Sequence, residues 1–168
     1  NISDEERRWY IGEIKRLSRE RDALLLAHNY EPSDVQDVAH FIGDSIHLAK
    51  IGRDSKNKVL IEAAVLFMNQ ILAVMKQPGQ IVLAPSLKAL CSLAAHADVN
   101  KVRAWKHAHP NGKVISYVNT YLDVKAESDI CCASANAAKV IQHMAELHPN
   151  DPLLFLPDIF LGYYAVNL

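Results

Sequence analysis

Short apolar runs alternate with longer segments of helical periodicity along the whole chain. The short runs have the length of strands and predict strands at 23–27, 58–65, 81–84, 113–117, 129–132 and 153–156. The longer segments predict helices over 3–22, 33–43, 46–52, 69–75, 100–109, 122–128 and 135–147, and from residue 161 onward. Strands that alternate with helices are typical of parallel sheets with helices on both faces. The sequence therefore predicts an α/β fold built from three-layer αβα lobes.

Two of the apolar runs end in polar residues and resemble each other. The first is Leu-Leu-Leu-Ala-His-Asn-Tyr at 24–30, and the second is Val-Ile-Ser-Tyr-Val-Asn-Thr at 114–120. Two copies of one βα unit explain the likeness, and chance similarity between two ordinary βα units is the alternative. On the first interpretation, residues 1–95 form one lobe that ends with the Cys91 loop, and residues 96–168 form a second lobe.

The two copies place candidate ligand-binding side chains at equivalent positions. His28 precedes Ser45 by 17 residues, and Tyr117 precedes Ser134 by the same 17 residues. Ligands bind at the carboxyl ends of parallel strands in open α/β folds. We therefore expect hydrogen-bonding and acid–base groups at the strand ends, namely His28, Tyr30, Tyr117 and Asn119.

Ser45 and Ser134 each stand where a helix is predicted to begin. Backbone N–H groups and a hydroxyl at a helix start suit a phosphate or a carboxylate. The alternative is that Asp44 and Ser45 only cap their helix. Together with the strand ends, the two serines predict a small anionic substrate held between the two lobes.

Composition and charge exclude several classes of function. Half of the residues are hydrophobic, 22% are charged, and the net charge is −1, which argues against a general nucleic-acid binder. No apolar run approaches the length of a membrane span, and no leader-like segment opens the chain, so we expect a cytoplasmic protein. The sequence contains no dinucleotide-binding, P-loop or serine-hydrolase motif.

Two further observations concern residues with costly or reactive side chains. The three cysteines do not make a secreted disulfide framework, and a reducing compartment with a free thiol or a metal thiolate fits better. Cys91 has no neighbouring cysteine, and a single loop cysteine is on its own more often inert. Glu62 lies within an otherwise apolar strand, where a carboxylate is costly unless it is paired or near the strand end.

The chain also carries an ordered set of short motifs. They are Ala-His-Asn-Tyr (27–30), Gly-Asp-Ser (43–45), Phe-Met (67–68), Cys-Ser-Leu (91–93), Arg-Ala-Trp-Lys (103–106), His-Pro (109–110), Tyr-Val-Asn-Thr (117–120), Val-Lys-Ala (124–126), Ser-Ala-Asn-Ala (134–137) and Phe-Leu-Pro-Asp (155–158). From about residue 10 to the end, this set resembles the quinolinate synthase family, the A protein of NAD biosynthesis.

The resemblance implies a fold and a reaction. Members of this family have three related αβα lobes around a pseudo-threefold axis, and each lobe gives one cysteine to a central [4Fe-4S] cluster. One iron stays open and acts as a Lewis acid on substrate oxygens. The enzyme condenses iminoaspartate with dihydroxyacetone phosphate, with loss of water and phosphate, to give quinolinate. About two of the three lobes and one of the three cysteines are present in this sequence.

The resemblance also implies roles for individual residues. It assigns substrate binding to His28, Ser45, Tyr117, Asn119 and Ser134. It assigns catalysis to His28 and Tyr30, with Tyr30 as an acid–base or positioning group, and it makes Cys91 the first cluster thiolate. The family needs no thiolate at Cys131 or Cys132, so both are expected to be buried structural residues.

Several positions depart from the family pattern. Asn69-Gln70 stands where the family has Ala or Gly followed by Glu, and Glu62 replaces an apolar residue. The segment 156–164 lacks the usual lysine and arginine and carries apolar residues that we expect to be exposed: Ile159, Phe160 and Tyr163. The third lobe is missing, and a partner chain could supply it. The alternative to a quinolinate synthase, or a fragment of one, is therefore a catalytically inactive anion-binding paralogue, or a fragment that needs a partner chain.

Overall fold

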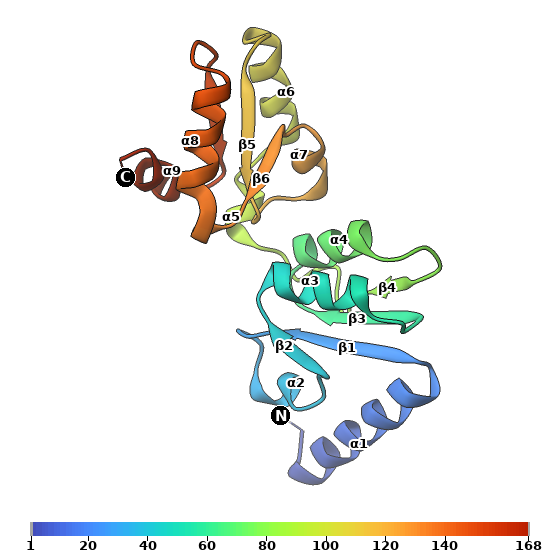
Figure 1. Ribbon diagram of the computed structural model, residues 1–168. Coiled ribbons are helices and arrows are strands. Elements are labelled where there is room, and N and C mark those ends of the chain that lie inside the picture. The colour runs from blue at the N-terminus through green and yellow to red at the C-terminus, as the bar shows by residue number, and fades with distance from the viewer. Residues whose placement is uncertain (1, 168) are drawn as a thin grey trace. The chain divides into compact units, whose positions relative to one another are not determined.

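The chain folds into two compact units that divide between Ala89 and Leu90. The computed structural model shown in Figure 1 describes residues 2–167. We call the unit up to residue 89 unit 1 and the unit from residue 90 onward unit 2. The sequence places the lobe boundary after residue 95, whereas this division assigns Cys91 to unit 2.

Unit 1 contains four helices and four strands among its described residues. The helices are α1 (Asp4–Glu20), α2 (Ser33–Gln36), α3 (Ser45–Asp54) and α4 (Leu66–Met75). The strands are β1 (Ala23–His28), β2 (Phe41–Gly43), β3 (Val59–Ala63) and β4 (Ile81–Leu83). Helix α1 begins with a capping box, in which Ser3 and Glu6 bond each other's backbone N–H groups.

The four strands of unit 1 form a parallel sheet in the order β2-β1-β3-β4. Figure 1 shows α3 and α4 on one side of β1 and β3, and α1 and α2 on the other side. Strand β1 is apolar along its whole length before His28, because both of its faces are covered. The predicted αβα layering is confirmed in this unit.

Unit 2 repeats this plan with a smaller sheet. Its helices are α5 (Ser92–Ala95), α6 (Val99–Ala108), α7 (Leu122–Ala126), the 3₁₀ turn η1 (Ser134–Asn136), α8 (Ala137–Leu147) and α9 (Ile159–Val166). Its strands are β5 (Lys113–Tyr117), β6 (Ile130–Cys132) and β7 (Leu153–Leu156). They form a parallel sheet in the order β6-β5-β7.

Neighbouring residues of β5 enter two separate cores on the two faces of this sheet. Val114 packs with Val102 of α6 and Val124 of α7. Ile115 packs on the opposite face with α8 and α9, through residues such as Ile141 and Ala165. Alternation along one buried strand thus produces the αβα layers of unit 2.

Strand register confirms that the two units share one plan. In unit 1, Leu26 pairs with Phe41 and His28 with Gly43. In unit 2, the residues 89 positions later form the equivalent pairs, Ile115 with Ile130 and Tyr117 with Cys132. The likeness of the two sequence stretches is therefore structural and does not arise by chance.

The predicted helix over 33–43 is wrong in its second half. Helix α2 ends at Gln36, and Phe41–Gly43 form the edge strand β2. Val35, Val38 and Phe41 have helical spacing, but pairing of Phe41 with Leu26 of β1 outweighs that local pattern. Helices α4 and α9 begin earlier than predicted, at Leu66 and Ile159, and the short helix α5 was not predicted.

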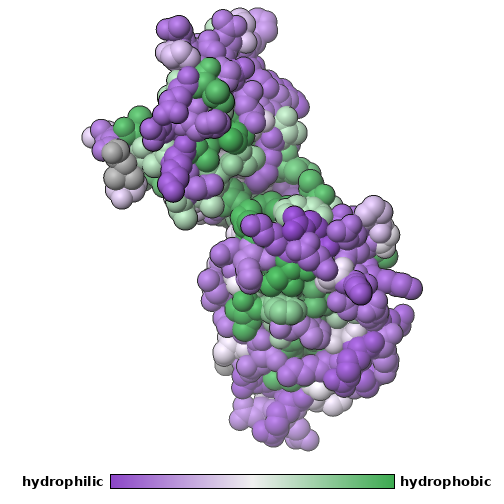
Figure 2. All heavy atoms as spheres, in the orientation of Figure 1, coloured by the Kyte–Doolittle hydropathy of each residue, from purple (hydrophilic) through white to green (hydrophobic). Residues whose placement is uncertain are grey.

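The surface carries both polar and apolar areas. On the face shown in Figure 2, hydrophilic residues cover most of each unit, and smaller apolar areas lie between them. Helix α9 leaves Ile159, Phe160 and Tyr163 exposed, as the sequence predicted. Within residues 2–167, no helix combines the length and the apolar character that a membrane span requires.

Candidate functional site

The strand ends of unit 1 bring three predicted site residues into one region. His28 is the last residue of β1 and pairs with Gly43, the last residue of β2, while the N–H of Asn29 donates to the carbonyl of Gly43 (3.1 Å). Asp44 then caps α3 by accepting from the N–H of His47 (2.9 Å). Ser45 is therefore the first residue of α3, close to the carboxyl end of β1, as predicted.

Tyr30 folds back onto His28. The two rings lie 4.0 Å apart between centroids, and the N–H of Tyr30 donates to Nδ1 of His28 (3.3 Å). The Tyr30 hydroxyl accepts from the N–H of Val65 (3.0 Å) and points at the sulfur of Met68 (3.8 Å). The start of α4 thus anchors the ring that covers His28.

The environment of His28 favours a neutral imidazole. Burial lowers the pKa of His28 below its ordinary value, and the nearby Asp44 carboxylate only partly opposes this. Because Nδ1 accepts from the backbone of Tyr30, the neutral ring carries its proton on Nε2. His28 can therefore offer one hydrogen-bond donor at neutral pH.

The strand ends of unit 2 gather the remaining predicted residues. Tyr117 ends β5, and its side chain lies near the hydroxyl of Ser134, the first residue of η1. Two residues further on, the amide Nδ2 of Asn119 lies 3.9 Å from Sγ of Cys91. Four candidate site residues, Cys91, Tyr117, Asn119 and Ser134, therefore belong to one small region of unit 2.

Burial and local negative charge keep the Tyr117 phenol protonated. Burial is the largest cause that raises its pKa, and the nearby Ser134 hydroxyl acts in the opposite direction. The negative charge of Asp158 adds to the increase. Tyr117 is consequently a neutral hydrogen-bonding group at neutral pH.

Lys125 is a residue of this region that sequence reasoning did not single out. Its ammonium donates to the carbonyl of Val118 (2.7 Å) and to the carbonyl and the hydroxyl (3.0 Å) of Thr120. Burial lowers the pKa of Lys125 to about 8, so the side chain is still largely charged at pH 7. These hydrogen bonds fix the turn that carries Asn119. The sequence does not indicate this role, because it depends on how α7 packs against the turn.

The three cysteines have different surroundings. Cys91 is half-buried at the start of α5, whereas Cys132 is buried in β6, where burial raises the pKa of its thiol to about 11. Cys131 is exposed, so the expectation that it is buried is wrong. It lies on β6, an edge strand of three residues. Successive side chains of a strand point to opposite faces, so Cys131 is exposed while its neighbour Cys132 is buried.

Residues 2–167 contain no cluster of three or more histidine, cysteine or acidic side chains arranged to hold a metal ion. A four-iron cluster is held by several cysteine thiolates. Cys91 is half-buried beside Asn119, and its role as a cluster ligand stays a prediction.

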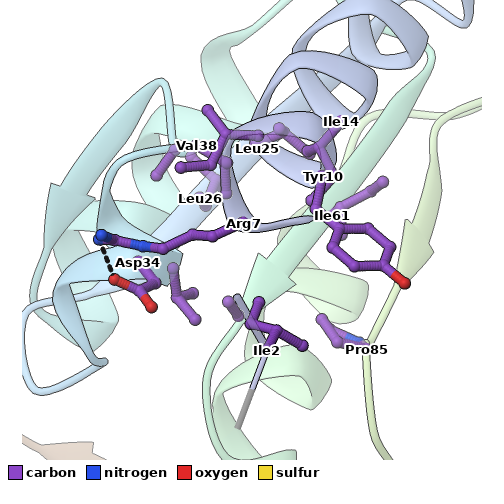
Figure 3. A pocket seen from close by; sticks show the side chains of 14 residues that line it. Ile2, Arg7, Tyr10, Ile14, Leu25, Leu26, Asp34, Val38, Ile61 and Pro85 are labelled. Atoms are coloured by element: carbon purple, nitrogen blue, oxygen red, sulfur yellow. Dashed lines mark hydrogen bonds and ion pairs between the residues drawn. The ribbon is translucent and has the colours of Figure 1, made fainter. Parts of the chain in front are cut away.

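A cavity of about 440 Å³ lies elsewhere, between α1 and the sheet of unit 1. Figure 3 shows that mostly apolar side chains line it, among them Tyr10, Ile14 and Ile61, with the Arg7–Asp34 ion pair at one side. None of the predicted site residues lines this cavity. It is therefore separate from the strand-end region of unit 1.

The geometry thus gives two sets of side chains, one in each unit. The first is His28, Tyr30 and Ser45, and the second is Cys91, Tyr117, Asn119 and Ser134. Each set combines neutral hydrogen-bonding groups at the end of a central strand with a serine at the start of the next helical turn. The expectation that both sets serve one substrate stays a prediction.

Comparison with known proteins identifies similar sequences. The family model described as Quinolinate synthetase A protein matches residues 12–167. The curated quinolinate synthase of Pyrobaculum aerophilum is 45% identical over 153 residues, which cover 90% of this chain and 48% of that protein. The quinolinate synthase of Thermus thermophilus is 43% identical over 157 residues, covering 93% of this chain and 49% of its own length.

A third relative, the quinolinate synthase of Desulforudis audaxviator, is 41% identical over 167 residues, which cover 99% of this chain and 52% of that protein. The chain therefore spans about half the length of the curated relatives it matches.

Proposed function

Because the chain belongs to the quinolinate synthetase A protein family, we propose that the protein containing it is a quinolinate synthase. The reaction would join iminoaspartate to dihydroxyacetone phosphate, with loss of water and phosphate, and would serve NAD biosynthesis. The observation that carries this proposal is the pair of strand-end sets, which occur at equivalent register positions in a chain 41–45% identical to proteins of that name.

In unit 1, we assign substrate binding to His28 and Ser45 and acid–base or positioning chemistry to His28 and Tyr30. A neutral imidazole with a proton on Nε2 can donate a hydrogen bond to a substrate oxygen, and its basic nitrogen, Nδ1, could accept a proton only after releasing the N–H of Tyr30. The hydroxyl of Ser45 and the backbone N–H groups at the start of α3 suit a phosphate or a carboxylate.

In unit 2, we assign substrate binding to Tyr117, Asn119 and Ser134. The hydroxyls of Tyr117 and Ser134 lie near each other, so one anionic group of a substrate could bind both. Both substrates are anionic, and the phenol, amide and hydroxyl donors can bind anionic oxygens without bringing a buried negative charge near them.

The [4Fe-4S] cluster belongs to the proposal for the whole protein. The described residues do not fit the complete cluster, so no step is assigned to it here. Cys91 would supply one thiolate, and the other ligands would come from the missing third lobe, from the rest of the second lobe or from a partner chain. We also propose a cytoplasmic location, because the three cysteines are free thiols, as a reducing compartment would keep them.

Anaerobic reconstitution of the whole protein with iron and sulfide tests this assignment. We expect visible absorption typical of an iron–sulfur cluster in the unchanged protein and in Cys131→Ser, and its loss in Cys91→Ser. Cys131 is the matched control, because it is an exposed free thiol without an assigned role. Equal absorption in both variants, or none in the unchanged protein, would refute the role of Cys91.

A further inference from the structure

Glu62 has its carboxyl group in the core of unit 1. The residue lies on β3, pairs with Leu26 of β1, and is 0% exposed. Neither of its carboxyl oxygens has a hydrogen-bond partner within residues 2–167. A carboxylate in this position would carry an uncompensated charge in an apolar interior, which is among the most costly arrangements in a folded protein.

The face of the sheet that carries Glu62 is the one covered by α3 and α4. A Cβ at Gly52 of α3 would meet Leu26, Leu60 and Leu72, so these side chains fill the layer around Glu62. All three leucines are buried. The layer around Glu62 is therefore largely hydrocarbon.

No charged partner reaches Glu62 from the surrounding elements. Helix α4 and strand β4 carry no titratable residue, and β1 carries only His28 at its end. The titratable residues of α3 lie toward solvent or pair with each other, namely His47, Lys50, Arg53 and Asp54. Burial is accordingly the only cause that shifts the pKa of Glu62, and it raises that pKa to about 7.

The repeat shows which side chain faces Glu62. Leu26 pairs with Glu62 as Ile115 pairs with Phe155, so Glu62 and Phe155 are equivalent. Val65 caps α4 three residues after Glu62, and Asp158 caps α9 three residues after Phe155. By the same count, Asn69 of α4 is equivalent to Gly162 of α9.

In unit 2, a Cβ at Gly162 would lie only 2.8 Å from Cδ1 of Phe155. The equivalent position of unit 1, which the register of the repeat sets opposite Glu62, is occupied by Asn69. Asn69 is 5% exposed, and its Nδ2 donates to the carbonyls of Ala64 (3.2 Å) and Val65 (3.4 Å). Its Oδ1 has no partner within residues 2–167.

Three buried oxygens of these two side chains therefore lack a donor within residues 2–167, two from Glu62 and one from Asn69. We propose that Glu62 is held as a neutral acid, that it donates its proton to Oδ1 of Asn69, and that this pair positions the turn between β3 and α4. At the equivalent positions of unit 2, the ring of Phe155 packs on Gly162 instead. Glu62 and Asn69 are positioning residues, since neither reaches the strand-end region.

The turn that the pair holds is the one that anchors Tyr30. Asn69 bonds the carbonyls of Ala64 and Val65, and the N–H of Val65 donates to the hydroxyl of Tyr30. Tyr30 in turn lies over His28. Ionisation of Glu62 would remove the bond to Asn69 and place a charge beneath this turn, so the position of Tyr30 would depend on pH.

The sign of the stability effect follows from the raised pKa. The unfolded chain loses the Glu62 proton near pH 4.5, whereas the folded chain keeps it to about pH 7. The stabilising contribution is therefore complete below about pH 4.5 and is lost as the pH rises to about 7. Between these two pH values, ionisation of Glu62 should raise the equilibrium constant for unfolding about tenfold per pH unit.

Denaturant unfolding of the chain between pH 5 and pH 9 tests the proposal with Glu62→Gln. The glutamine amide can donate to Oδ1 of Asn69 at every pH, so the variant should match the unchanged chain near pH 5. Above pH 8, it should be more stable, by about two orders of magnitude in the unfolding constant. Glu146→Gln, at an exposed glutamate, is the control, and its unfolding constant should follow that of the unchanged chain over the whole pH range.

A second measurement separates positioning from simple packing. Besides the titration of His28, which lies against the ring, the ring proton resonances of Tyr30 should show a transition with a midpoint near pH 7 in the unchanged chain that is absent from Glu62→Gln. A double-mutant cycle should show that Glu62→Phe and Asn69→Gly each destabilise unit 1, while the two together, which reproduce the pair of unit 2, recover stability. Parallel pH curves for Glu62→Gln and the unchanged chain, or additive effects in the cycle, would overturn the proposal.

Discussion

At the residue scale, burial has the same effect on two strand-end side chains, one of which is a base and the other an acid. It lowers the pKa of His28 and raises the pKa of Tyr117, and in both cases it favours the uncharged form. The same physical effect, stronger because burial is deeper, acts on Glu62. The strand ends thus offer neutral hydrogen-bonding groups, while the charged side chains nearby mainly cap helices or fix turns.

Lys125 is the clearest example of a charge that fixes a turn. Substitution Lys125→Met keeps the hydrocarbon part of the side chain but leaves carbonyls of Val118 and Thr120 without their donor. We expect a loss of about 1–3 kcal/mol in the free energy of unfolding, measured with denaturant. Lys139→Met on α8 is the matched control, because Lys139 is exposed. An equal and small effect of both substitutions would refute the role of Lys125.

At the element scale, close contact between α3 and α4 supports the strand ends of unit 1. Gly52 and Ser55 lie at the end of α3, and the carbonyl of Gly52 accepts from Ser55 and from Gln80. The backbone at Gly52 approaches Leu72 of α4 so closely that no Cβ fits between them. A glycine at this position therefore sets how tightly the two helices pack over β1 and β3.

Two glycine substitutions test this packing. Gly52→Ala forces Leu72 to move, and we expect it to lower the free energy of unfolding by about 1–3 kcal/mol. Gly12→Ala on α1 meets no atom within 4 Å, so it should raise that energy by up to about 1 kcal/mol through helix propensity alone. Calorimetric midpoints that move in the same direction for both variants would contradict this account.

The element scale also shows what the sequence could predict. The αβα layers and the repeat followed from apolar runs and from equal spacing, because a strand buried on both faces needs a continuous apolar segment. Strand β2 was missed because its three residues are half-exposed and continue a helical spacing, so only pairing with β1 defines them.

The site was predicted residue by residue, but its contacts were not. Strand ends and helix starts selected His28, Tyr117 and Ser134, since those positions follow from the αβ order alone. The contact of Asn119 with Cys91 and the bonds of Lys125 depend on how loops close, which local sequence does not determine. Glu62 drew attention as costly, but its facing residue became visible only through the register of the repeat.

At the scale of the whole molecule, each unit repeats one plan, and the chain matches about half of each curated relative. Unit 2 exposes large apolar side chains on α9, with Phe160 at 87% and Ile159 at 80%. Such exposure is typical of a surface that another part of a protein covers. Activity is therefore proposed for the whole protein only, and this chain holds two sets of candidate substrate-binding residues.

The rate of quinolinate formation by the whole protein, from iminoaspartate and dihydroxyacetone phosphate under anaerobic conditions, tests this assignment most directly. The unchanged protein should form quinolinate, and Ser45→Ala and Ser134→Ala should each slow it about 10- to 100-fold, as expected for loss of a hydrogen bond to a charged group. Ser33→Ala, which changes another serine at a helix start, should leave the rate unchanged. Absence of quinolinate, or equal rates in all three variants, would contradict the account.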